Sequence, residues 1–210
     1  MAEVLITLGI IGVVAAMTLP TIIQNYQKRA LQSQFKKVYS VLSNAVVKSY
    51  ADLGYEPTCS YIDGLHIGST VENCIEMNNQ MLANLGIIKK CDDHAYENGC
   101  IGPIKGLDTV RMENNPSWTS EQASESTSDD VRFRESYIRN SNPAYVLLDG
   151  SVLMLYHIGY PLYLVDVNGL KNPNKWGYDI FVFKIKNNRL QCHEYSYQKG
   201  GSTCRDMLLK

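Results

Sequence analysis

The hydrophobic pattern divides the first 53 residues of the chain into two halves. Nearly every position from Val4 to Ile23 is apolar, and no charged residue occurs from Val4 to Gln27. About 20 apolar helical residues, at a rise of roughly 1.5 Å each, cross the ~30 Å hydrocarbon core of a bilayer. We therefore expect residues 1–27 to form a hydrophobic transmembrane helix.

From residue 28 the pattern becomes that of an amphipathic helix. Apolar and small residues recur at spacings of three and four, which is typical of one buried helix face. They are Leu31, Phe35, Val38, Leu42, Ala45, Val46, Ser49, Tyr50 and Leu53. Gly54 provides a natural C-terminal stop. The two halves predict one helix from about Ala2 to Leu53, roughly 75–80 Å long, whose residues 28–54 pack on a folded domain.

Three residues inside this helix weaken it locally. Pro20 removes a backbone hydrogen bond and crowds the preceding turn, so we expect a kink there. Gly9 and Gly12 either lower the stability of the helix or allow neighbouring helices to approach closely. Glycine and proline are also common in membrane helices, which is the simpler interpretation of all three.

Residues 55–142 are polar and irregular in pattern. Thr70 to Leu85 predict a short helix that ends at Gly86. Residues 114–130 are rich in serine, threonine and acidic residues and lack apolar periodicity, which is typical of an exposed, mobile loop.

Residues 143–210 have the pattern of an antiparallel β-sheet followed by a C-terminal loop. Asp149-Gly150 is a two-residue hairpin signal, and Asn187-Asn188 indicate a second turn. The expected strands are Ala144–Leu148, Ser151–His157, Pro161–Val167, Asp179–Ile185 and Arg189–Tyr195. This order predicts an α+β fold in which the sheet packs on the amphipathic half of the long helix.

The six cysteines all follow the hydrophobic segment. An even number on one side of such a segment predicts disulfides and an oxidising compartment, and buried thiols in a cytosolic domain are the alternative. Many connectivities are possible. Because short loops close most easily, we favour the pairs Cys59–Cys74, Cys91–Cys100 and Cys192–Cys204.

Oxygen-bearing side chains concentrate in the loop between the third and fourth of the expected strands. Calcium takes roughly 6–8 oxygen ligands, and this loop carries Asp166, Asn168, Asn172, Asn174 and Asp179. The spacing departs from the EF-hand template, because Leu170 occupies a ligand position and the closing glutamate is missing. The alternative to a calcium site is a turn in which Asn and Asp side chains bond to the backbone.

The overall composition limits the classes of function. The chain has 20 basic and 21 acidic residues, and its net charge of −1 does not indicate a nucleic-acid partner. The histidines are scattered, and the sequence contains no zinc-protease motif, nucleophile elbow or phosphate-binding glycine loop. We therefore expect the chain not to be an enzyme.

The segment EVLITLGIIGVVAAMTLP, from Glu3 to Pro20, carries a specific resemblance. It resembles the N-terminal segment of type IV pilins and type II secretion pseudopilins, closely over the first 30 residues or so and loosely in the α+β layout that follows. The resemblance implies a structural subunit that resides in the inner membrane before assembly. There it assembles with copies of itself and related pilins into a helical filament, and Gly9, Gly12 and Pro20 belong to the assembly helix.

Glu3 has a defined role in that family. The resemblance implies that its carboxylate pairs with the free N-terminal amine of a neighbouring subunit inside an apolar helical bundle. An unpaired carboxylate is costly in such a low-dielectric environment, so the pair favours the correct axial register. The alternative is an acidic residue at a helix start, which the helix dipole favours by about 0.3–1 kcal/mol.

Precursors in the family carry a basic leader that ends in Gly and is followed by Phe-Thr-Leu-x-Glu. A prepilin peptidase cleaves after this Gly and methylates the new N-terminus. In this sequence Met1 occupies the position of the Leu, without the preceding Gly, Phe and Thr. The peptidase is therefore a partner only if a leader precedes Met1.

Two features of the sequence give opposite predictions for the side of the membrane on which the domain lies. Lys28, Arg29, Lys36 and Lys37 would place the domain in the cytoplasm by the positive-inside rule. The cysteines indicate the opposite side, and a basic leader would restore the charge balance. We therefore expect the domain outside the cytoplasmic membrane, in the periplasm or on a surface filament. The alternative function is a membrane-anchored extracytoplasmic ligand-binding module whose helix serves only as an anchor.

Overall fold

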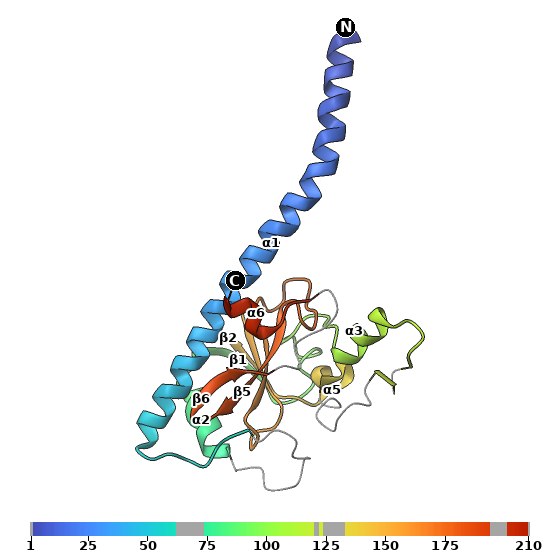
Figure 1. The fold of residues 1–210 in the computed structure, drawn as a ribbon. Helices are drawn as coiled ribbons and strands as arrows, with labels where there is room; N and C mark the ends of the chain where they lie inside the picture. The colour runs from blue at the N-terminus through green and yellow to red at the C-terminus, as the bar shows by residue number, and fades with distance from the viewer. Residues whose placement is uncertain (1, 62–73, 120–121, 124–132, 194–200, 210) are drawn as a thin grey trace.

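A long helix leads into a domain built on a β-sheet (Figure 1). The computed structural model describes residues 2–61, 74–119, 122–123, 133–193 and 201–209. Helix α1 runs without a break from Ala2 to Leu53. Its N-terminal half extends away from the domain, and its C-terminal half lies along it. The structure confirms the single long helix and the α+β fold class.

The C-terminal half of α1 packs on the domain through the stripe that its periodicity predicts. Phe35, Leu42 and Ala45 are buried against the sheet. The buried hydroxyl of Ser49 donates to the carbonyl of Ala45 (2.6 Å) and accepts a hydrogen bond from Asn84 Nδ2 (3.2 Å), so it is satisfied. The chain leaves the helix at Gly54, whose φ of +69° lies in the left-handed region that favours glycine.

Within the described residues the sheet contains six strands, each antiparallel to the next, in the order of the sequence. They are β1 (Ile87–Cys91), β2 (Ala144–Leu147), β3 (Val152–Leu155), β4 (Leu162–Asp166), β5 (Ile180–Lys186) and β6 (Arg189–Cys192). Gly150 turns β2 into β3 with a φ of +84°, and Asn187 and Asn188 turn β5 into β6 with φ of +52° and +59°. Both turns are those predicted, because these residues tolerate the left-handed conformation of tight hairpin turns.

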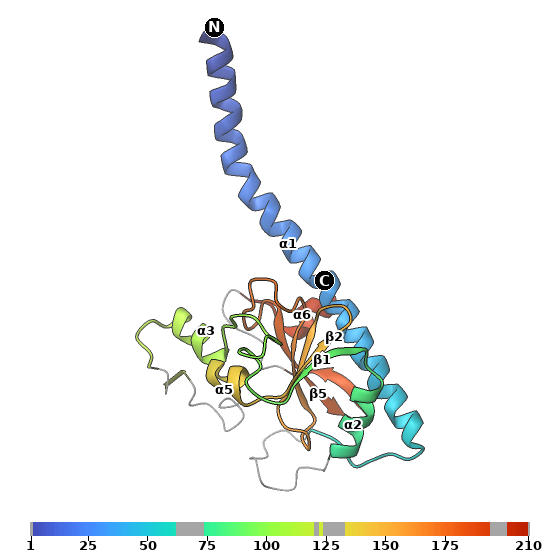
Figure 2. The same cartoon turned by 180° about the vertical axis from the view of Figure 1, so that it is seen from behind.

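The sheet is buried on both faces. On one face Phe35 of α1 packs against Phe181 and Phe183, with ring centroids 4.8 and 5.6 Å apart. On the other face residues such as Ile104, Leu107 and Ile138 help to form a second core, in which the rings of Phe133 and Trp176 lie 5.1 Å apart. The domain therefore has three layers, which are α1, the sheet and the layer on the far face (Figure 2).

Strand β1 and the far layer come from the part of the chain predicted to be irregular. The same part of the chain forms α2 (Ile75–Ala83), which packs on the α1 side of the sheet, and α3 (Leu107–Asn114) and α5 (Glu135–Asn140), which belong to the far layer. Helix α2 lies inside the helix predicted from Thr70 to Leu85, of which residues 70–73 lie outside the described residues. The sequence pattern does not predict β1, because Lys89 and Lys90 interrupt its apolar residues, as is common on edge strands.

The loop predicted at residues 114–130 is described only in part. Helix α3 ends at Asn114, and residues 115–119 and 122–123 follow. Ala123 is fully buried, and the Arg111 side chain donates to its carbonyl (2.9 Å). This part of the loop is therefore tied to the domain. The predicted mobility of residues 120–121 and 124–130 lies outside the described residues.

Three disulfides join Cys59 to Cys74, Cys91 to Cys100 and Cys192 to Cys204. They close the short loops favoured from the sequence. The first lies in the core beneath α1, the second in the far core, and the third joins β6 to helix α6 (Cys204–Leu209). Disulfides persist in oxidising compartments, so they indicate an extracytoplasmic domain.

Candidate functional site

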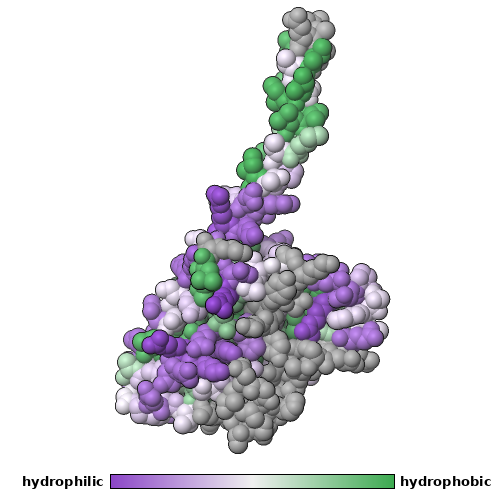
Figure 3. Space-filling view, viewed as in Figure 1, coloured by the Kyte–Doolittle hydropathy of each residue, from purple (hydrophilic) through white to green (hydrophobic). Residues whose placement is uncertain are grey.

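The N-terminal half of α1 is exposed on all sides. We call residues 4–23 the apolar arm. The large apolar side chains that the structure describes in it have exposed fractions from 51% at Ile23 to 73% at Met17. Figure 3 shows the arm separated from the domain by a polar band. Among the described helices, α1 is long and apolar enough to cross a membrane. Such a surface is unfavourable in water, so it indicates a membrane anchor.

Two of the three threonine hydroxyls of the arm, those of Thr7 and Thr18, donate hydrogen bonds within the helix. Thr7 Oγ1 donates to the carbonyl of Val4 (3.0 Å), and Thr18 Oγ1 donates to that of Val14 (2.9 Å). Hydrocarbon offers no water to satisfy polar groups, which must therefore find partners in the protein. Both threonines thus suit an apolar environment.

The residues predicted to act in assembly all lie on α1. A Cβ added at Gly9 or Gly12 would meet nothing within 4 Å, so these glycines leave room for a neighbouring helix rather than for a part of this chain. Pro20 lies inside α1, which is curved between its two halves (Figure 1). Glu3 lies in the first turn of α1, and its side chain lies outside the described part of the structure.

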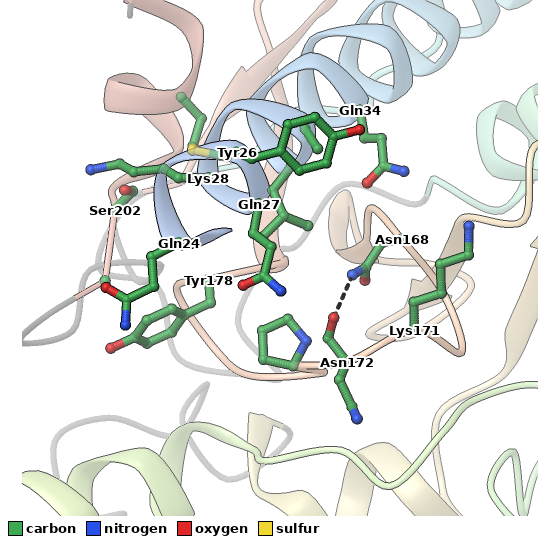
Figure 4. Close-up of a pocket in the computed structure, with 15 residues that line it drawn as sticks. Gln24, Tyr26, Gln27, Lys28, Gln34, Asn168, Lys171, Asn172, Tyr178 and Ser202 are labelled. Atoms are coloured by element: carbon green, nitrogen blue, oxygen red, sulfur yellow. Dashed lines mark hydrogen bonds between the residues drawn. The ribbon is translucent and has the colours of Figure 1, made fainter. Parts of the chain in front are cut away.

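The five predicted calcium ligands lie on the loop between β4 and β5. At the start of the loop Asp166 is buried, and its Oδ1 accepts hydrogen bonds from the backbone N–H groups of Asn168 (3.1 Å) and Gly169 (2.8 Å). Asn168 Nδ2 in turn donates to the carbonyl of Asn172 (3.2 Å) (Figure 4). The first half of the loop is therefore a turn held by its own side chains.

The second half of the loop is held in the same way. Asp179 is buried, and its two carboxylate oxygens accept hydrogen bonds from the backbone N–H groups of Asn174 (2.7 Å) and Lys175 (2.6 Å). In the amide orientation that satisfies its surroundings, the Asn174 side chain donates to the carbonyls of Gly169 and Lys171. These bonds join the two halves of the loop to each other.

This arrangement fits a self-contained turn better than a calcium cage. Calcium needs roughly 6–8 oxygens, whereas both carboxylates here already accept backbone hydrogen bonds. Asn168 Oδ1 is buried without a hydrogen bond, but a single free oxygen does not supply the coordination shell of a calcium ion. No group of three or more His, Cys, Asp or Glu suited to a metal occurs in the described part of the chain. Calcium binding stays a prediction, and the geometry favours the turn.

The burial of this loop changes the pKa values of its two aspartates, Asp166 and Asp179. Burial raises the pKa of Asp179 to about 6, and burial together with the charge of Asp179 raises the pKa of Asp166 well above its ordinary value. In an unfolded chain both groups titrate near ~3.9. Between about pH 4 and 6 the folded state therefore holds a proton that the unfolded state has lost. The contribution of these groups to stability is largest at the acidic end and falls as the pH rises.

We expect the Asp179→Asn variant to lose part of this pH dependence. From pH 4 to 6.5 the free energy of unfolding of the wild type should fall by on the order of 2 kcal/mol more than that of the variant. Urea denaturation at half-unit pH steps measures the difference. Asp52→Asn is the control, because a hydrogen bond from Asn84 lowers the pKa of Asp52. Its contribution has the opposite sign and lies mainly below about pH 4, so the slope from pH 4 to 6.5 should stay close to that of the wild type. Identical slopes for wild type and Asp179→Asn would contradict the assigned cause.

A cavity of about 600 Å³, which we call the neck pocket, lies where α1 leaves the domain (Figure 4). Its lining comes from residues 24–34 of α1, residues 168–178 of the β4–β5 loop and residues 201–207. Two lysines, Lys28 and Lys171, line it together with amides and hydroxyls, and none of its described lining residues is a carboxylate. Sequence patterns do not reveal this cavity, because its three segments lie far apart in the chain.

Comparison of the chain with models of protein families, with curated proteins and with solved structures finds no match. The architecture itself is pilin-like, with a long N-terminal apolar helix packed on an antiparallel sheet.

Proposed function

We propose that this chain is a pilin or pseudopilin, a structural subunit of a type IV pilus or a type II secretion-like filament. The observation that carries the proposal is helix α1, which has an exposed apolar half and a half fixed to the domain through residues such as Phe35 and Leu42. Such a helix can pass from a bilayer into a bundle of like helices without exposing its apolar surface to water.

Before assembly the subunit would span the inner membrane once, with its domain outside the cytoplasm. The three disulfides support this orientation, because they need an oxidising compartment. Its partners would be copies of itself and related pilins, and a prepilin peptidase if a leader precedes Met1. The role is structural rather than catalytic.

In the filament the apolar arms would form the central bundle. Glu3 would set the axial register by pairing with the N-terminal amine of a neighbour, and Gly9 and Gly12 would allow neighbouring helices to approach closely. The three-layered domain would form the outer surface, because the amphipathic half of α1 holds it beside the bundle.

Cell fractionation tests this proposal. In cells that carry the assembly machinery we expect the chain in filaments sheared from the surface, and in cells without that machinery we expect it in the inner-membrane fraction. Immunoblots of both fractions and immunogold electron microscopy of the sheared material measure the distribution. An unrelated inner-membrane protein serves as the control for lysis. A chain that stays in the membrane fraction in both strains would contradict the filament and favour a membrane-anchored ligand-binding module.

A further inference from the structure

We propose that the neck pocket binds the phosphate-bearing headgroup of an anionic membrane phospholipid. The inference rests on one part of the proposed function, namely that the apolar arm spans a bilayer before assembly. It adds a ligand and a binding site for the membrane-resident subunit. The depth of the pocket, its charge and its hydrogen-bonding groups each support it.

The pocket lies at the depth of the lipid headgroups. The apolar arm ends at Ile23, and the lining of the pocket begins at Gln24. The 20 residues of the arm rise about 30 Å, which matches the hydrocarbon core. The next seven residues, up to Ala30, rise about 10 Å and so cover the headgroup layer of roughly 5–8 Å. Tyr26, which lines the pocket and is 72% exposed, has the position of an interfacial aromatic residue.

The charge of the pocket suits an anion. Lys28 comes from α1 and Lys171 from the β4–β5 loop, and Figure 4 shows them on opposite sides of the pocket. Neither lysine forms an ion pair with another described residue. The described residues of the lining include no carboxylate, so Lys28 and Lys171 bring positive charge to the pocket that no described lining residue compensates. A phosphate diester would supply that charge at the level of the membrane surface.

The other lining groups suit a lipid better than a neighbouring helix. Side chains such as Gln24, Gln27 and Ser202 can hydrogen-bond phosphate and glycerol oxygens, while Leu31 and Met207 offer apolar surface to the glycerol and the first acyl carbons. The apolar arm of a second copy would bury the same amides and both lysines without partners. Burial of unpaired polar and charged groups is unfavourable, so the lining favours the amphipathic ligand.

Native mass spectrometry of the full chain in detergent, with added lipid, tests the inference. We expect one phosphatidylglycerol per chain to be retained at concentrations at which phosphatidylcholine with the same acyl chains is not. Lys28→Gln/Lys171→Gln should weaken this retention by roughly thirtyfold, because each basic residue at an anionic membrane surface contributes about fivefold. Lys36→Gln/Lys37→Gln should retain the lipid like the wild type, since it removes two exposed lysines of the same helix that do not line the pocket.

Three results would overturn the inference. The first is equal retention of both lipids by the wild type. The second is an equal loss of lipid retention in the two double variants. The third is a protein dimer that forms in place of the lipid complex and disappears in Lys28→Gln/Lys171→Gln. The last result would identify a second copy as the occupant. Flotation with phosphatidylglycerol vesicles separates this inference from the proposed function. A wild type that does not float refutes the membrane anchor itself, whereas a wild type that floats without preferring the anionic lipid refutes only the neck pocket.

Discussion

The Glu3→Leu variant is expected to enter the membrane normally and to form no filaments. Glu3 is the only charged side chain among the first 27 residues, and a bundle of apolar arms would place it in a low-dielectric environment. Leucine there would leave the amine of the neighbouring subunit buried and unpaired. Removing one partner of a buried ion pair costs about 3–5 kcal/mol, which weakens each subunit contact by roughly two to four orders of magnitude. In the membrane, leucine is at least as favourable as glutamate.

Thr7→Leu is the matched control for this prediction. It also replaces a polar residue by leucine on the same helix, about one turn further on, but the Thr7 hydroxyl already donates to the carbonyl of Val4 in its own helix. Thr7→Leu should therefore assemble, and immunoblots of the sheared and membrane fractions compare the two variants. Filaments from Glu3→Leu at the wild-type level would refute the role of Glu3 in setting the axial register. Glu3 would then be only an acidic residue that the helix dipole favours at the start of α1. Loss of filaments in both variants would show that the polarity of the arm matters rather than the charge.

The parts of the fold that are set by residues close together in the chain can be predicted from the sequence. The spacing of Phe35 and Leu42 shows which face of α1 is buried, because helical periodicity is a local property. Asp149-Gly150 and Asn187-Asn188 locate two hairpin turns, because these residue types accept positive φ. The short cysteine loops are also local, and all three are the disulfides observed.

The parts that depend on distant contacts are not predictable in this way. Strand β1 begins with Ile87 and Ile88 and then has two lysines, so only its pairing with β2 makes it a strand. The far core draws single residues such as Phe133 and Trp176 from segments that have no apolar periodicity. The neck pocket exists only because α1, the β4–β5 loop and the C-terminal residues meet at one point.

The β4–β5 loop shows why residue type alone leaves two hypotheses open. Asp and Asn side chains bind either a cation or the backbone of a turn, and the direction of each oxygen decides between them. Here the left-handed conformation of Gly169, with φ of +63°, brings its N–H to Asp166. A Cβ at Gly169 would lie 2.0 Å from the carbonyl oxygen of Gly150, so this close approach requires glycine. No local sequence signal predicts that contact between two loops.

The second large effect is expected from Phe35→Ala, which removes an aromatic contact between α1 and the sheet. Phe35 is fully buried, and its ring packs edge-on against Phe181 at 4.8 Å and beside Phe183 at 5.6 Å. Truncation of a buried phenylalanine costs about 3–5 kcal/mol, because both the transfer energy and a cavity count against the folded state. This is a large share of the stability of a domain of this size.

Denaturation in urea of the full chain in detergent measures this loss, with the near-ultraviolet circular dichroism of the domain as the signal. Val47→Ala is the control, because Val47 lies on the same helix but is 57% exposed, so its truncation should change the free energy of unfolding by less than about 0.5 kcal/mol. If α1 is the element that couples the apolar arm to the domain, Phe35→Ala should also yield fewer sheared filaments at an unchanged membrane level. A loss of stability as small as that of Val47→Ala would contradict the packing of α1 on β5, and with it the coupling on which the proposed filament depends.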